Sequence, residues 1–129
     1  MENMMNAKEI GREIIRELQG DAAIVAKDKA RNEFNSVFQD YADGVCFGQI
    51  WARPGIERKQ RSILNIAMLT ALNRPNQLRS HLNGALNNGC TVDELREILL
   101  QAVVYCGLPA ALDAVKIAEE VLRERKLLA

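Results

Sequence analysis

The sequence predicts an all-α protein, and three observations support that fold class. Apolar residues recur at three- and four-residue steps along most of the 129 residues, which is the period of an amphipathic helix. β-branched residues do not gather into the alternating pattern of strands. Three prolines are present, and none lies inside a periodic segment. The length suits one domain with a real core, so we expect residues 1–129 to form a single-domain helical bundle.

The first part of the chain is expected to form three helical segments. A helix over about residues 7–18 ends at Gly20, which suits the left-handed turn that follows a helix. Asp21 can cap a short second segment. A longer helix should then run to about Trp51 and stop before Pro54, because proline lacks the backbone donor and restrains the preceding residue. The apolar faces of the first and third segments consist of Ile10, Ile14, Ile15 and Leu18, and of Phe34, Val37, Phe38, Tyr41 and Val45.

Two further helices are expected between residues 57 and 88. The first is charged in its opening turns and apolar almost all round from Ile63 to Leu72. A helix of that kind is usually buried on most sides, so its expected place is the centre of the bundle. Pro75 suits the first turn of the next helix, which should extend to about Asn88. The inward residues of this helix should be Leu78, Leu82, Ala85 and Leu86.

The best-specified boundary lies near residue 90. Gly89 suits the position after a helix end, and Thr91 with Glu94 forms the T-x-x-E pattern of a capping box. A break at residues 107–109 precedes a last amphipathic helix to about Arg125, and the remaining tail is expected to be frayed or docked on a neighbour. The helix between these boundaries should bury Leu95, Ile98, Leu99, Ala102 and Val103.

Composition excludes several classes of function. Lys plus Arg equals Asp plus Glu at 17 each, so no net field attracts the chain to nucleic acid or to anionic lipid. The start has no basic region followed by an apolar stretch, and no apolar run reaches the ~18 residues of a membrane span. Three cysteines without a C-x-x-C pair suit reduced thiols. We therefore expect a cytoplasmic protein that binds neither nucleic acid nor membrane.

The apolar helix faces exceed what a bundle of this size can enclose. Residues 63–72 and 98–108 are the clearest cases, since both are apolar on nearly every side. Packing these segments against copies of themselves would bury the surplus, so we expect a homo-oligomer.

No metal-ligand spacing, glycine-rich phosphate loop or G-x-S-x-G elbow is visible, so neither a metal nor a cofactor is implied. Candidate site residues beside apolar segments are Trp51, Arg53, Gln101, Tyr105 and the single histidine, His81. Four more arginines lie near the ends of two helices that should pack together, and such residues are usually solvated: Arg58, Arg61, Arg74 and Arg79. A lone histidine is more often structural or exposed than catalytic. Gln101 is the most informative of the set, because an amide inside an apolar run needs a hydrogen-bond partner. Composition and periodicity therefore indicate a helical oligomer with a candidate anion-binding pocket, and no particular reaction.

Motifs along nearly the whole chain indicate a family. They include W-x-R-P-G at residues 51–55, H-x-x-G-A-L-N-N-G at residues 81–89 and L-L-Q-x-x-V-Y-C-G-x-P-A-A at residues 99–111. In this combination the chain resembles the carboxymuconolactone decarboxylase family, and its small single-domain decarboxylase branch in particular. The resemblance implies an all-helical fold of the alkylhydroperoxidase D-like type and a cofactor-free homo-oligomer, usually a hexamer such as a trimer of dimers.

The resemblance also implies a reaction, the decarboxylation of 4-carboxymuconolactone. The departing carboxylate of this substrate is attached to the ring carbon that is linked through a double bond to the lactone carbonyl, so the substrate can take up the electrons itself. The protein needs only to hold the carboxylates, stabilise the oxyanion and return one proton to carbon. His81 matches the family histidine and becomes the candidate proton donor or oxyanion partner. Arg53 would clamp a carboxylate, Trp51 and Tyr105 would wall the pocket, and Gln101 would orient the lactone.

Three positions depart from the family pattern. Gln49, counted with the substrate-binding set, stands where relatives often carry an acidic residue, and Asn83 stands where many carry arginine. At Glu57, relatives commonly have a better helix-capping residue. A paralogue with another small carboxylated or lactone substrate therefore stays open, as does a non-catalytic oligomer that binds a small anion. Dithiol redox chemistry of the related peroxidase branch is not expected, because Arg74 and Gln77 occupy the places of its two cysteines.

Overall fold

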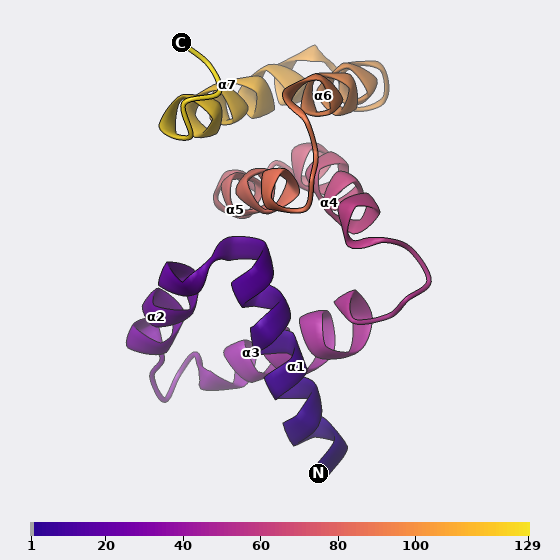
Figure 1. The fold of residues 1–129 in the computed structure, drawn as a ribbon. Coiled ribbons are helices and arrows are strands. Elements are labelled where there is room, and N and C mark those ends of the chain that lie inside the picture. Colours follow the sequence, from indigo (N-terminus) through magenta and orange to yellow (C-terminus); the bar gives the residue numbers. More distant parts are fainter. Residues whose placement is uncertain (1) are drawn as a thin grey trace. The chain divides into compact units, whose positions relative to one another are not determined.

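The computed structural model describes the backbone of residues 2–129 and the side chains of residues 6–129. Over these residues the chain forms helices and no strand, which confirms the predicted all-α class (Figure 1). No helix in the described part of the chain has both the length and the apolar character needed to cross a membrane. The helices are α1 (Glu2–Gln19), α2 (Asp21–Ala30), α3 (Ser36–Tyr41), the π-helix η1 (Ala42–Trp51), α4 (Arg58–Leu72), α5 (Pro75–Asn87), α6 (Val92–Cys106) and α7 (Leu108–Glu124).

These helices belong to two compact units, which are described separately. The N-terminal unit comprises α1, α2, α3 and η1 and ends at Glu57. The C-terminal unit runs from Arg58 to Ala129 and comprises the four remaining helices. The single-domain organisation expected for residues 1–129 stays a prediction.

In the N-terminal unit, α1 and η1 cross in direct backbone contact at two glycines. A Cβ atom on Gly11 would lie 1.8 Å from the carbonyl oxygen of Asp43. A Cβ atom on Gly48 would lie 2.0 Å from the carbonyl oxygen of Ala7. Only glycine has no side chain to place there, so these two residues set how closely the helices approach.

The predicted long helix is realised as α3 followed by η1, and its predicted end at Trp51 is confirmed. The π-helical spacing continues to the last turn, where the amide of Ala52 donates to the carbonyl oxygen of Phe47 at 3.1 Å. The predicted apolar face is wrong for most of its length in the single chain, because four of its five members are exposed by 61–81% and the fifth, Val45, is half-buried. These exposed residues are Phe34, Val37, Phe38 and Tyr41. The residues that η1 buries are Asp43, Gly44, Gly48 and Trp51. Trp51 is the large apolar side chain in this set, and Gly48 lies at the crossing with α1.

Trp51 anchors the small apolar core of the N-terminal unit. Its ring stacks on that of Phe47, with centroids 5.5 Å apart and planes inclined by 28°. Ile14 and Leu18 of α1 pack against the same pair. The inward placement predicted for these two residues is confirmed, whereas Ile10, expected on the same face, is 48% exposed.

The C-terminal unit has the larger core, formed where α4 and α5 pack on α6 and α7. The predicted capping box of α6 is confirmed: Thr91 Oγ1 accepts from the Glu94 amide, and Glu94 Oε1 accepts from the Thr91 amide, both at 3.0 Å. Gly89 adopts the expected left-handed conformation with φ +95°. The buried residues of this core are Ile66, Leu78, Leu82, Ala85, Cys90, Leu95, Leu99, Ala114, Ala118, Val121 and Leu122.

The apolar composition of α4 predicted a helix buried on most sides, and this prediction is wrong for the single chain. The buried face of the helix consists of Ser62, Ile66 and Thr70. The opposite face carries a stripe of large apolar side chains at four-residue steps, each at least 50% exposed. The stripe consists of Leu64, Met68 and Leu72. The excess of apolar surface inferred from the sequence is therefore real, and the oligomer inferred from it stays a prediction.

The C-terminal tail folds back on its own helix and is not frayed. The Leu127 amide donates to the carbonyl oxygen of Leu122 at 2.8 Å, after Lys126 turns the chain with φ 60°. Arg123 Nε then donates to the carbonyl oxygen of Ala129 at 3.1 Å.

Candidate active site

His81 lies on the buried face of α5. Leu78 precedes it by three residues and Ala85 follows it by four, so the three side chains share one face of the helix. His81 is 9% exposed, and its two neighbours on that face are 2% and 0% exposed. The imidazole is therefore held among apolar side chains and is not a solvated surface group.

Burial determines the protonation state of His81. The charged imidazolium loses hydration in this environment, which lowers the pKa of His81 below its ordinary value. Because the ordinary pKa of histidine is already about 6.5, the neutral ring predominates at pH 7. A neutral imidazole has one N–H donor and one bare nitrogen acceptor, so it can donate a hydrogen bond to an oxygen that gains charge.

One polar neighbour of His81 is Asn65, on α4. Asn65 Nδ2 lies 3.4 Å from His81 Nδ1. Sequence reasoning missed this residue, although its signal was available. Asn65 is an amide inside an apolar run, and the requirement for a partner that was applied to Gln101 applies equally to it.

Three predicted site residues lie at the end of η1 in the N-terminal unit. Trp51 is 7% exposed and takes part in the core, so its ring supports the helix end from within. Gln49 is exposed two residues earlier, and Arg53 is exposed just after the helix ends. The backbone amide of Arg53 donates to the carbonyl oxygen of Ile50 at 3.0 Å, which continues the turn beyond η1.

The two remaining predicted residues lie on α6. Gln101 and Tyr105 are one turn apart and both are exposed on the single chain, Tyr105 by 79%. The structure therefore brings Gln49, Trp51 and Arg53 together at one helix end, and Gln101 and Tyr105 together on one helix face. Gln101 is exposed, so its amide can meet water on the single chain and does not need the buried hydrogen-bond partner that we expected for it.

An apolar groove of about 310 Å³ lies between α6 and α7. Arg96 and Glu119 are the charged residues on its wall, and Leu128 of the folded-back tail closes part of it. None of the predicted site residues lines the groove. A groove with so few polar groups does not fit a dianionic substrate, whose carboxylates need donors.

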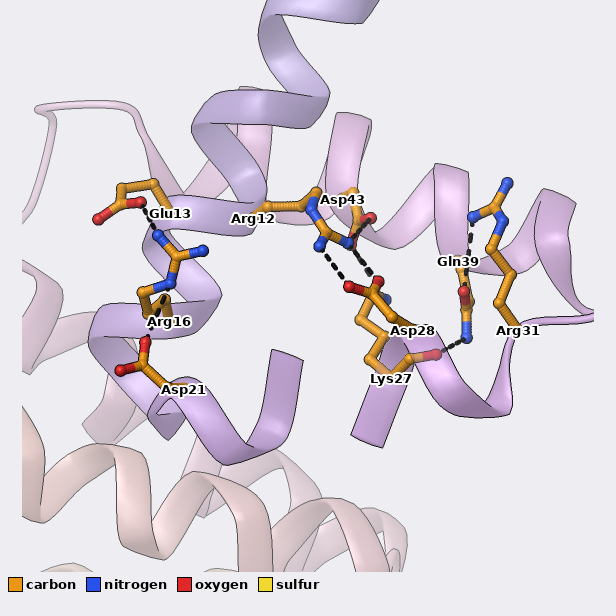
Figure 2. A network of polar contacts seen from close by, with 9 residues as sticks. All are labelled: Arg12, Glu13, Arg16, Asp21, Lys27, Asp28, Arg31, Gln39 and Asp43. Carbon is orange, nitrogen blue, oxygen red and sulfur yellow. Dashed lines mark hydrogen bonds and ion pairs between the residues drawn. The ribbon is translucent and has the colours of Figure 1, made fainter. Parts of the chain in front are cut away.

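A network of charged side chains holds the N-terminal unit together, and sequence reasoning missed it as well (Figure 2). Arg12 of α1 donates both terminal nitrogens to the two carboxylate oxygens of Asp28, each at 2.8 Å. Asp43 of η1 is 3% exposed, and its carboxylate lies 3.0 Å from Lys27 Nζ and 3.9 Å from Arg12 Nη1. Figure 2 shows the Arg12 guanidinium facing both carboxylates, so one cation connects α1, α2 and η1. The network thereby positions the helix that ends at Trp51.

Asn83, where many relatives carry arginine, has a guanidinium beside it. Arg125, just past the end of α7, donates to the backbone oxygen of Asn83 at 3.3 Å and to its side-chain oxygen at 3.4 Å. The same guanidinium donates to Asn87 Oδ1 at 3.0 Å. Positive charge is thus present at this point of α5, supplied by the residue that follows α7.

Among the described residues, no group of three or more His, Cys, Asp and Glu side chains is arranged to hold a metal ion. The three cysteines are free thiols. Burial is the first cause that raises the pKa of the Cys90 thiol, and the nearby Glu94 carboxylate adds to it, so the reactive thiolate form is disfavoured near neutral pH.

Comparison with known proteins identifies the family. The model of the carboxymuconolactone decarboxylase family matches residues 37–120. The chain is 40% identical to a 4-carboxymuconolactone decarboxylase of Acinetobacter baylyi over 114 residues, which are 88% of this chain and 85% of that protein. It is 38% identical over 78 residues to the nitrosuccinic acid decarboxylase NpaB of Metarhizium robertsii, covering 60% of this chain and 54% of that one. Both relatives are named as decarboxylases, which confirms the sequence-based prediction of a carboxy-lyase. The chain belongs to the carboxymuconolactone decarboxylase family.

Proposed function

We propose that this chain is a cofactor-independent carboxy-lyase that converts 4-carboxymuconolactone to the 3-oxoadipate enol-lactone, as a step of protocatechuate catabolism in the β-ketoadipate pathway. The working protein is a cytoplasmic homo-oligomer, a hexamer in the family's usual arrangement. The likeness to a protein named for this substrate, over 88% of the chain, supports the choice of substrate. The buried, neutral imidazole of His81 is the structural observation that carries the chemistry.

The reaction places few demands on the protein. The bond between the ring carbon and the carboxylate breaks, and carbon dioxide leaves. The electron pair of that bond moves through the double bond onto the lactone carbonyl oxygen, which gives a dienolate. When the pair moves back, the ring forms a new C–H bond with one proton. A hydrogen-bond donor aimed at the carbonyl oxygen stabilises the dienolate and the transition state that leads to it.

The residues take the following roles in this proposal. His81 faces the lactone oxygen or supplies the proton. Arg53 holds a substrate carboxylate, because a guanidinium binds carboxylates through two parallel hydrogen bonds. Gln49, Trp51, Gln101 and Tyr105 complete the substrate-binding set. Gln101 and Tyr105 are exposed on the single chain, which supports a pocket completed by a second copy.

A direct assay tests the substrate. The purified protein, without added metal or cofactor, is mixed with 4-carboxymuconolactone, and the ultraviolet change on decarboxylation is followed together with the release of carbon dioxide. We expect turnover that persists in the presence of a metal chelator. No release of carbon dioxide at micromolar protein would contradict the proposal.

A second candidate substrate class is favoured by the same comparisons. NpaB is named for nitrosuccinic acid, an acyclic dicarboxylate, and the likeness covers 60% of this chain. In addition, many relatives carry an arginine at position 83, whereas this chain has Asn83 with the guanidinium of Arg125 beside it. Nitrosuccinate and other small carboxylated compounds therefore belong in the same assay. Greater kcat/KM with nitrosuccinate than with the lactone would identify a paralogue, and thermal stabilisation by the lactone without turnover would indicate a protein that only binds small anions.

A further inference from the structure

We propose that Asn65 is a positioning residue that keeps His81 in the neutral tautomer with its proton on Nε2. His81 then acts on the substrate as a neutral hydrogen-bond donor and not as an imidazolium acid. The catalytic part of this inference rests on the proposed function, whereas the tautomer itself is a property of the protein alone.

The geometry carries the first step. Asn65 Nδ2 lies 3.4 Å from His81 Nδ1, across the packing of α4 against α5. An amide nitrogen in a side chain is a donor and never an acceptor. With the amide of Asn65 oriented so that Nδ2 faces the ring, His81 Nδ1 is the acceptor in this contact. A neutral imidazole has one protonated and one bare nitrogen, so the proton of His81 is on Nε2.

The burial of His81 also favours the neutral ring with its proton on Nε2. A protonated ring would place an N–H on Nδ1 against the N–H groups of Asn65, two donors facing each other. It would also place a positive charge on a ring that is 9% exposed, where burial disfavours the charged form. Both effects favour the neutral form with Nε2–H.

The consequence for the reaction is a division of roles. As the bond to the departing carboxylate breaks and its electrons reach the lactone oxygen, Nε2–H donates a hydrogen bond to that oxygen. His81 keeps its proton throughout. The proton that forms the new C–H bond comes from water, which leaves hydroxide to combine with the carbon dioxide released. Asn65 contributes by aiming the donor, because a ring with its proton on Nδ1 would present a lone pair to the developing negative charge.

The test uses the fact that the chain has one histidine. In a ¹H–¹⁵N correlation spectrum of the labelled protein, every imidazole signal belongs to His81, and the pyridine-like nitrogen resonates far downfield of the N–H nitrogen. We expect Nε2 as the N–H nitrogen and Nδ1 as the bare one at pH 7.5. A wild-type spectrum with the proton on Nδ1, or with a charged ring, would overturn the inference without any variant.

Two substitutions and one control make the test specific to Asn65. Asn65→Leu removes the donor at nearly equal volume, so the Nδ1 signal should move further downfield. Asn65→Asp provides an acceptor and a negative charge, so the titration midpoint of His81 should rise by about one pH unit or more. Asn73→Asp adds the same charge in the turn before α5, where asparagine and aspartate both tolerate the observed φ of 56°, and should leave the midpoint unchanged. Identical Nδ1 shifts in the wild type and Asn65→Leu, or an unmoved midpoint in Asn65→Asp, would refute the inference.

Activity then separates the two proposals. If the protein decarboxylates 4-carboxymuconolactone with its proton on Nε2, Asn65→Leu should lower kcat more than it changes KM, by about 10-fold. If the wild type carries the proton on Nδ1 yet turns the lactone over, the role of Asn65 is refuted and the proposed function is not. If the spectra agree and no substrate turns over, the tautomer is upheld and the proposed function is refuted.

Discussion

Replacing Gly48 by alanine tests how the N-terminal unit is built. In an ordinary helix this change stabilises the protein by about 0.5–1 kcal/mol, because alanine loses less backbone freedom on folding. At Gly48 the new Cβ atom would lie 2.0 Å from the Ala7 carbonyl oxygen, 2.7 Å from the Ala7 carbonyl carbon and 2.8 Å from the Asp43 carbonyl oxygen. All three are backbone atoms, so no side-chain rotation relieves the contact.

The magnitude follows from what must move. Ordinary contact distances are near 3.5 Å, so α1 and η1 have to separate by more than ~1 Å at the crossing. That displacement loosens the packing of Ile14 and Leu18 on Trp51. Overpacking of this kind costs about 1–3 kcal/mol and sometimes more, and here the backbone cannot adapt locally. We expect Gly48→Ala to lower the free energy of unfolding by about 3 kcal/mol, or the melting temperature by about 10 °C.

The measurement is urea unfolding followed by circular dichroism at one fixed protomer concentration, because oligomers gain stability with concentration. Gly55→Ala is the matched control, since a Cβ atom at Gly55 meets nothing within 4 Å. The control should differ from the wild type by less than ~0.5 kcal/mol. A Gly48→Ala protein as stable as the wild type would refute the close backbone crossing of α1 and η1.

Three further predictions concern a cap, a titration and a surface. Thr91→Ala removes the hydroxyl that accepts from the Glu94 amide and should lower the free energy of unfolding by about 1 kcal/mol in the same urea assay; no change would mean that the capping box is not formed in solution. Because burial lowers the pKa of His81, the unfolded chain binds a proton before the folded chain does, and stability is lost as pH falls from about 6.5 through the folded pKa. Between pH 7 and pH 5 the free energy of unfolding should therefore fall more steeply for the wild type than for His81→Ala, and equal slopes would contradict the buried imidazole. Met68→Glu places a charge in the exposed stripe of α4, so multi-angle light scattering should report a smaller particle than for the wild type, whereas an unchanged oligomer would exclude this stripe from the interface.

The features that could be predicted from the sequence are those encoded locally. Thr91 and Glu94 are three residues apart, Gly89 needs only its own φ, and Pro75 needs only the first helical turn. Each of these signals lies within about one helical turn of the sequence. The helix boundaries that they predicted, at the start of α5, the end of α5 and the start of α6, are confirmed. The buried face of α5 was equally predictable, because helical periodicity determines which residues face the core.

The features that could not be predicted depend on partners distant in the sequence. Arg12 pairs with Asp28 and Asn65 contacts His81 across 16 residues in both cases, and periodicity contains no information about such pairs. The π-helical form of η1 occurs where Gly48 contacts the backbone of α1, a helix distant in the sequence. The pattern of apolar residues in η1 contains no information about this contact, so it could not distinguish a π-helix from an α-helix. The family motif singled out His81 within the sequence, but only the packing of α4 and α5 reveals its burial and its partner.

The role of His81 is the centre of this account, and one comparison tests it most directly. The steady-state rate of 4-carboxymuconolactone decarboxylation is measured for the wild type, for His81→Ala and for Ser80→Ala, an exposed neighbour on the same helix. We expect His81→Ala to remain folded and to lose ~10²-fold or more in kcat, the usual scale for removing one acid–base or oxyanion-stabilising group. Ser80→Ala should keep the wild-type rate. A folded His81→Ala protein that works at the wild-type rate would contradict the account.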